Sequence, residues 1–230
     1  MSSKRAPVKR LLPHVREWLI LNEAISLFAR NGPDGLIPGL ARKLGISQAL
    51  IFRYFGTKEK LVDRVYEIVC FTRWDPVWEK MIGEESLDLA DRLKAFFKSY
   101  IAIADDYNWV RISMFLALTD HEMKKRYVRS YVSTLIEKIA RAVKSSQGHP
   151  KSAPLTDADK EQVWQIHSAI VHYAVRKHIH GSIVTIDRNQ YVDLLVDRFM
   201  HGIGGRKEKG RRHPPRASVR ARRAGPGTQP

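Results

Sequence analysis

Cysteine is almost missing from this chain of 230 residues, and several kinds of site are missing with it. Cys70 is the only cysteine, so no disulfide can form within the chain and a cysteine-rich zinc site is excluded. No hydrophobic run approaches the roughly 18 residues that a membrane-spanning helix needs. Pro13 and Arg16 interrupt the N-terminal segment where a signal peptide would need a continuous apolar core. We therefore expect a cytoplasmic protein.

Sequence patterns typical of enzymes are lacking as well. We find no Gly-rich phosphate loop, nucleophile elbow or pair of catalytic carboxylates. His167 and His172 do not have the i, i+4 spacing that places two metal ligands on one helix face, and no Glu-x-x-His motif accompanies them. His178 and His180 are better explained as basic residues at a helix end before Gly181. We predict no catalytic residue, no cofactor, no metal site and no enzymatic activity.

Acidic residues are scarce at both ends of the chain. The formal net charge is +16, and it is unevenly distributed. Residues 1–64 contain 12 Lys and Arg against 5 Asp and Glu, residues 65–203 contain 19 against 18, and residues 204–230 contain 9 against 1. Such basic ends favour a polyanionic partner, above all nucleic acid.

The alternating pattern of a β-strand is also missing, and apolar residues recur at helical spacing instead. We therefore predict an all-α fold, with Ser47, Thr57 and Ser86 as N-caps and a loop over residues 145–157. The expected helices span residues 15–30, 38–44, 48–55, 58–74, 87–104, 108–118, 122–144, 157–178 and 189–200.

Two short helices that meet at Gly45 indicate a helix-turn-helix motif, braced by the longer first helix. Ile51 and Phe55 can face that brace, which leaves the other side of the second short helix for the DNA major groove. The Gln48 amide can address a base edge, preferably adenine, and small apolar neighbours can touch a thymine methyl. Basic and hydroxyl side chains suit phosphate. The candidate DNA-contacting residues are Gln48, Ala49, Leu50, Phe52, Arg53, Tyr54 and Lys58.

Residues 20–61, ILNEAISLFARNGPDGLIPGLARKLGISQALIFRYFGTKEKL, resemble the DNA-binding head of the tetracycline-repressor (TetR) family of bacterial regulators. The matching pieces are A-x-x-L-F-A-x-x-G at 24–32, L-A-x-x-L-G-I-S at 40–47 and Y-F-x-x-K-E-x-L at 54–61. The resemblance implies a three-helix head and a C-terminal helical effector-binding and dimerisation domain. It also implies a repressor that a small-molecule effector releases from DNA.

Some positions depart from the family pattern. Residues 36–39 supply no hydroxyl at the start of the second helix, where the family usually has Thr or Ser. Phe52 stands where tyrosine is common, and Leu50 where threonine is frequent. Base reading is therefore expected to depend on Gln48 and Arg53. The alternative that stays open is a constitutive DNA-binding or architectural protein without an effector.

Charge and resemblance together divide the chain into four parts. We expect a basic arm at 1–14, the helix-turn-helix domain at 15–64, the helical domain at 65–203 and a basic tail at 204–230, whose composition predicts disorder. Arg5, Lys9 and Arg10 could reach a minor groove or a phosphate. The tail suits nonspecific contact with nucleic acid.

The helical domain offers two further expectations, for which ordinary core packing is the plain alternative. The last two helices are apolar on two faces, and in the resembled family such helices pair with a second subunit, so we expect a homodimer on a palindromic operator. The candidate interface residues are Trp164, Ser168, Val171, Val175, Val192, Val196 and Phe199. In that family the same domain holds a small-molecule pocket. The candidate pocket residues are Phe71, Trp74, Trp78, Phe97, Tyr100, Trp109, Arg111, Phe115, His167 and His172.

Overall fold

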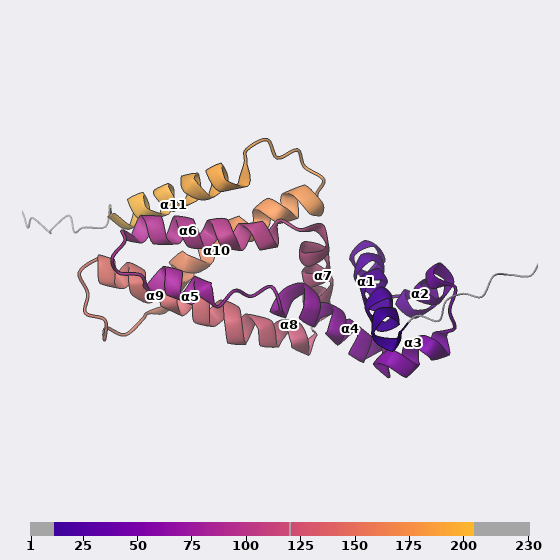
Figure 1. Ribbon diagram of the computed structural model, residues 1–230. Helices are drawn as coiled ribbons and strands as arrows, with labels where there is room; N and C mark the ends of the chain where they lie inside the picture. Colours follow the sequence, from indigo (N-terminus) through magenta and orange to yellow (C-terminus); the bar gives the residue numbers. More distant parts are fainter. Residues whose placement is uncertain (1–11, 120, 205–230) are drawn as a thin grey trace, which may run out of the picture.

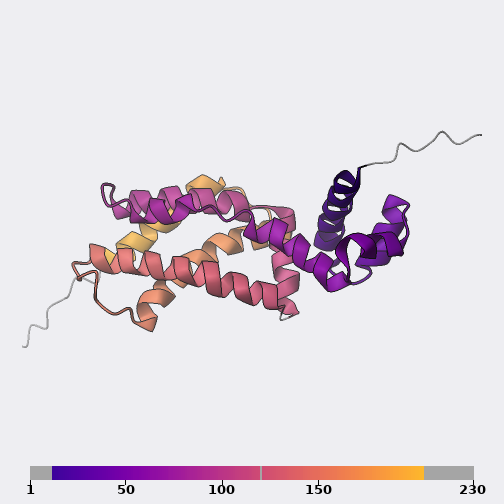
Figure 2. The same ribbon diagram turned by 60° about the horizontal axis from the view of Figure 1, so that its bottom comes forward.

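The computed structural model describes residues 12–119 and 121–204, and within them every regular element is helical, as the sequence predicts (Figure 1). The helices before α4 form a small head at one end, and the later helices form a longer body, with α4 between the two (Figure 1). The turned view of Figure 2 shows the same division. Most of the predicted basic arm and all but the first residue of the predicted tail lie outside the described residues.

The head consists of α1 (Pro13–Asn31), α2 (Leu36–Leu44) and α3 (Gln48–Phe55). Helix α2 begins two residues before the predicted start at Pro38. Gly35 adopts the left-handed conformation (φ 68°) and ends the preceding turn, so Leu36 can enter the helix. Proline is tolerated in this first turn because its missing N–H would have no partner within the helix.

Helix α4 (Lys58–Tyr66) continues directly into a π-helix, η1 (Glu67–Phe71). The predicted cap is confirmed, because the Thr57 hydroxyl accepts a hydrogen bond from the Lys60 N–H at 3.2 Å. The predicted helix to residue 74 is too long, since the run ends at Phe71. This continuous run begins beside the head and ends inside the body, so one element crosses the predicted boundary at residue 64 (Figure 1).

Eight further elements of the body lie within the described residues. They are α5 (Val77–Gly83), α6 (Leu89–Ala104), α7 (Tyr107–Leu118), α8 (Glu122–Tyr127), the π-helix η2 (Val128–Val132), α9 (Ser133–Ser146), α10 (Asp157–His178) and α11 (Arg188–Gly204). The predicted Ser86 cap is wrong: Asp88 accepts from the Ala90 N–H at 3.1 Å, while the Ser86 hydroxyl donates to Glu84. Helix α10 starts with a capping box formed by Thr156 and Asp159.

One hydrophobic core connects head and body. It includes Phe28 of α1 and Ile51 of α3 in the head, and Phe97 and Ile170 in the body, all fully buried. Helix α11 packs along α6, and α7 packs against both α1 and α10. Among the helices of the described residues, none is long and apolar enough to cross a membrane.

Candidate nucleic-acid interface and effector region

The turn between α2 and α3 fixes how the second helix leaves the first. Gly45 lies in the left-handed region (φ 65°), which costs glycine little, and both its N–H and that of Ile46 bond to the Ala41 carbonyl. The Ser47 hydroxyl then caps α3 by accepting from the Leu50 N–H at 3.2 Å, as predicted. These contacts define the start of α3 and therefore which of its side chains face outward.

Helix α3 has one buried and one exposed face. Ile51 and Phe55 are buried against the rest of the head. Gln48, Ala49 and Arg53 are exposed, as is Phe52, with 40% of its surface open to solvent. Leu50 and Tyr54 lie half-buried at the edges of this face. The predicted residues of α3 thus form one surface, which we call the reading face: Gln48, Ala49, Leu50, Phe52, Arg53 and Tyr54.

Lys58 lies just beyond the reading face at the start of α4. Its ammonium group is 3.6 Å from Asp34, a carboxylate whose side chain is 98% exposed. Exposed ion pairs of this kind contribute little free energy, so a phosphate could take the place of Asp34. The first backbone N–H groups of α4 also favour an anion at this end.

Arg42 of α2 and Lys60 of α4 are exposed basic residues that sequence reasoning did not select. Lys43 of α2 is instead engaged with Glu23 of α1, which also lies 3.7 Å from Arg30. Lys43 differs from Arg42 and Lys60 because it pairs with the Glu23 carboxylate. The sequence alone does not show that Glu23 lies next to Lys43.

The contact between α1 and α7 ties the head to the body. Arg111 of α7 donates to the carbonyl oxygens of Ala29 and Arg30 at the C-terminal end of α1, where a cation is favoured. Phe115, one turn further along α7, packs on Phe28, with ring centroids 6.2 Å apart. A side chain at Gly32 would come within 3.1 Å of Phe115, and φ is 77° there, so glycine is needed at this crossing.

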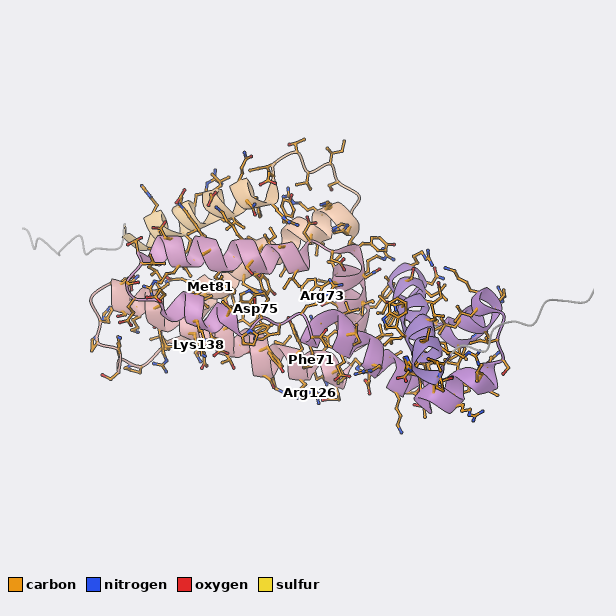
Figure 3. All side chains as sticks on the ribbon, viewed as in Figure 1. Phe71, Arg73, Asp75, Met81, Arg126 and Lys138 are labelled. Atoms are coloured by element: carbon orange, nitrogen blue, oxygen red, sulfur yellow. The ribbon has the colours of Figure 1, made fainter. Side chains whose placement is uncertain are left out.

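An aromatic cluster occupies the middle of the body. The rings meet mostly edge to face at centroid distances that favour aromatic pairs, such as Phe71 on Tyr131 at 5.3 Å and Trp74 on Trp78 at 5.0 Å. Both π-helices contribute to it, η1 through Phe71 and η2 through Tyr131. The cluster consists of Tyr66, Phe71, Trp74, Trp78, Phe96, Phe97, Tyr100, Tyr127 and Tyr131. Figure 3 shows Phe71 beside Arg126, whose guanidinium lies 5.0 Å from the ring centroid.

Polar groups are enclosed with the cluster. His167 of α10 is buried, and its Nε2 lies 3.0 Å from the Tyr100 hydroxyl. Lys124, which sequence reasoning missed, donates to the Ser113 hydroxyl at 2.7 Å. Burial lowers the pKa of Lys124 and lowers that of His167 to about 4, because charge is poorly solvated there. A half-buried lysine that donates to a serine hydroxyl is not a pattern that sequence spacing can predict.

The predicted pocket residues do not all lie together. Phe71, Trp74, Trp78, Phe97, Tyr100 and His167 belong to or touch the cluster. Trp109 is buried, and its indole nitrogen has no hydrogen-bond partner among the described residues. The other three predicted residues lie apart from the cluster. Arg111 and Phe115 are occupied at the contact with α1, and His172 is exposed beside His180, with ring centroids 5.8 Å apart.

The predicted interface residues also differ in burial: some lie in the core and others are exposed or half-buried. Val192 and Val196 are fully buried in the chain's own core, where α11 packs on α6, so their assignment to a subunit interface is wrong. Ion pairs from Lys94 to Asp197 and from Lys98 to Asp193, each 2.7 Å, border that contact. The remaining candidates are exposed or half-buried: Trp164, Ser168, Val171, Val175 and Phe199. Leu194, with 41% of its surface exposed, is an apolar residue of α11 that the prediction left out.

The head of this chain is similar in sequence to known proteins. Residues 20–65 match the family described as bacterial regulatory proteins, tetR family. Over 71 residues the chain is 37% identical to the HTH-type transcriptional repressor Rv3405c of Mycobacterium tuberculosis and to the HTH-type transcriptional regulator Mb3439c of Mycobacterium bovis. The matched segment is 29% of this chain, which spans 38% of the length of these curated relatives.

The whole fold has counterparts among solved structures. A TetR-like transcriptional regulator from Rhodococcus sp. RHA1 is similar with a TM-score of 0.64 and 19% identity, over 84% of this chain and 100% of that one. At this identity the similarity concerns the fold, and it extends from the head into the helical body.

Proposed function

We propose that the chain belongs, by its N-terminal domain, to the tetR family of bacterial regulatory proteins, whose pattern residues 20–65 match, and that it is a sequence-specific DNA-binding repressor. We propose further that it acts as a homodimer on a palindromic operator in the cytoplasm and that a small-molecule effector releases it. The observation that carries the proposal is the reading face of α3. Its polar and basic side chains are free for DNA while Ile51 and Phe55 hold the helix to the head.

The reading face has the chemistry of direct base recognition. Gln48 can donate and accept at once, which matches the N6 and N7 edge of adenine in the major groove. Arg53 lies about one and a half turns further along α3, where it suits guanine or a phosphate. Tyr54 and Lys58 suit the DNA backbone, which positions the helix without reading sequence. The excess of basic residues in 1–64 would add a salt-dependent, sequence-independent attraction.

The effector is proposed to bind at the aromatic cluster. A hollow bounded by Glu67, Phe71, Arg126, Ser130 and Tyr131 opens beside it, between the two π-helices. π-Helices occur frequently at functional sites. Since η1 is the continuation of α4, a ligand here would press on the element that carries Lys58.

The domain division follows from the same element. We propose a DNA-binding unit over 15–64 and an effector and dimerisation unit over 65–203, joined by the continuous run from Lys58 to Phe71. In a two-fold dimer, two reading faces would enter successive major grooves about 34 to 36 Å apart, or a multiple of that distance. This spacing is the reason to expect a palindromic operator.

The test is selection of DNA sequences from a random duplex library, followed by binding measurements on variants. Replacing Gln48 by alanine is expected to relax preference at one position in each half-site, at a cost of roughly 1 to 3 kcal/mol for the preferred base. Replacing Lys58 by alanine is expected to weaken all sequences alike and to reduce the salt dependence. Gln147→Ala, an exposed amide far along the body, is the matched control. An unchanged ranking of operator variants in Gln48→Ala would contradict the base-reading role.

A further inference from the structure

A second hollow, separate from the aromatic cluster, lies between α5 and α9 in the half of the body away from the head. Its volume is about 550 Å³, which is within the range of small-molecule sites. Ile82 and Ala142 supply apolar surface, and Gly83 leaves room at the end of α5. Figure 3 labels Lys138, which reaches this region from α9.

Cations outnumber carboxylates around the hollow. Arg92, Lys138, Arg141 and Lys151 line it, against two acids. Both acids are already neutralised, because Lys138 pairs with Glu79 and Lys151 pairs with Glu85. Arg141 is exposed and makes no ion pair or hydrogen bond within residues 12–119 and 121–204. Within the described residues neither guanidinium group forms an ion pair, although the charge of Arg92 lowers the pKa values of the nearby Glu84 and Glu85 carboxyl groups.

Arg92 is held by one hydrogen bond, while another of its donors has no partner among the described residues. Its guanidinium donates to the Ile82 carbonyl at 2.8 Å, which fixes the side chain against the last turn of α5. Its Nε is buried and finds no hydrogen-bond partner in the part of the chain that the structure describes. A buried donor of a charged group that lacks an acceptor is unfavourable, so this lining side chain keeps unused hydrogen-bonding capacity.

We propose that this hollow binds a small amphiphilic carboxylate. The carboxylate would accept hydrogen bonds from Arg92 and Arg141, since a planar guanidinium matches two carboxylate oxygens. A short hydrocarbon chain would lie against Ile82 and Ala142, where burial removes apolar surface from water. The site uses none of the proposed DNA-contacting residues, so it stands independently of the proposed repressor function.

Gly83 allows the hollow to be filled without disturbing the fold. A Cβ built at Gly83 meets no heavy atom within 4 Å, and this glycine is not among those with positive φ. Leucine is also a better helix former than glycine, so Gly83→Leu should fold at least as well as the parent chain. Its side chain would occupy space that the hydrocarbon chain needs.

The experiment is isothermal titration calorimetry of the full chain with sodium octanoate, in the absence of DNA. Octylammonium and octan-1-ol are the matched cationic and neutral probes. We expect octanoate to bind, Arg141→Gln to weaken it about ten-fold, as loss of a charge-assisted hydrogen bond would, and Gly83→Leu to abolish it. Lys80→Gln removes an exposed charge of α5 outside the lining and should change affinity less than about two-fold.

Several outcomes would overturn the proposal. The first is no saturable heat up to about 5 mM octanoate, where even marginal affinity would be visible. Equal binding of octylammonium would exclude recognition of the anion. Undiminished binding by Gly83→Leu or Arg141→Gln would place octanoate elsewhere on the protein. Because DNA is absent, none of these results bears on whether the reading face binds an operator.

Discussion

His167 shows what burial does to one titratable residue. Its neighbours are the Tyr100 hydroxyl from α6, the Trp164 ring from its own helix and the charge of Lys124 from α8. Desolvation is the larger cause that lowers the pKa of His167 to about 4, and the Lys124 charge acts in the same direction. The native protein therefore holds this imidazole neutral at pH values where an unfolded chain would protonate it.

Stability is therefore expected to depend on His167 between about pH 6.5 and pH 4. The unfolded state binds the proton first, so the contribution is complete above pH 6.5 and is lost as pH falls through 4, up to about 3 kcal/mol. His167→Gln keeps a polar side chain for Tyr100 but does not titrate, and it should flatten this part of the pH profile. Urea unfolding at fixed protein concentration between pH 7 and 4 measures it, with exposed His149→Gln as the control. A slope as steep in His167→Gln as in the parent would contradict the assignment.

At the scale of single elements, the start of α10 rests on a reciprocal cap. The Asp159 N–H bonds to the Thr156 hydroxyl at 3.2 Å, and the Thr156 N–H bonds to the Asp159 carboxylate at 2.8 Å. Lys144 of α9 lies 2.6 Å from the same carboxylate. Hydrogen bonds from Lys144 and Thr156 lower the pKa of Asp159 to about 2. The cap thus also fastens α10 to the end of α9.

Thr156→Ala removes one half of this cap. The expected loss is about 1 kcal/mol in the free energy of unfolding, the usual cost of removing an N-cap hydroxyl. Urea unfolding measures it, and Thr185→Ala, an exposed threonine of the loop before α11, should change stability by a few tenths of that amount. If both variants unfold at the same urea concentration as the parent, the cap contributes nothing measurable.

Helices could be predicted from local sequence where caps and apolar spacing agree, and not elsewhere. Ser47, Thr57 and the 157–178 helix were found from such signals. Helix α5 was missed because its seven residues carry little periodicity of their own, and its place depends on Trp78 packing into the aromatic cluster. Ser86 and Asp88 are both good caps by type, so only the structure decides between them.

The functional surfaces, like the helices, could be predicted from the sequence only in part. The reading face was predictable because a short helix with a buried stripe leaves only one other side. The place of Arg111 and Phe115 at the contact with α1 could not be predicted, because the sequence does not show that α7 crosses the end of α1. Likewise, α11 has apolar residues on two faces, and it is α6 that determines that Val196 faces inward and Leu194 outward.

At the scale of the whole molecule, the proposed homodimer can be tested at the apolar residues of α10 and α11 that are not buried in the core. Val171 is half-buried and Leu194 exposed, so replacing both with glutamate should yield monomers that keep their helical content. Val196→Glu should instead unfold the chain, because it places a charge in the core without a partner. Light scattering and circular dichroism distinguish these outcomes. A dimer that persists at micromolar concentration in the double variant would place the interface elsewhere.

The last prediction concerns coupling between the two ends of the run from Lys58 to Phe71. This run begins with Lys58, the proposed phosphate contact, and ends with Phe71 in the aromatic cluster. Arg111 of α7 adds a second link between head and body, since it donates to a carbonyl oxygen of α1. A ligand at the cluster that favours a different separation of the reading faces would lower operator affinity about 5 to 150-fold, a coupling of roughly 1 to 3 kcal/mol. Operator DNA must then weaken ligand binding by the same factor. Calorimetric titrations of a compound found by thermal-shift screening, with and without operator, measure this reciprocity. Gln48→Ala is the control, since it should leave the DNA-free ligand affinity unchanged. Equal affinities with and without operator would favour the alternative, a dimer that holds DNA constitutively.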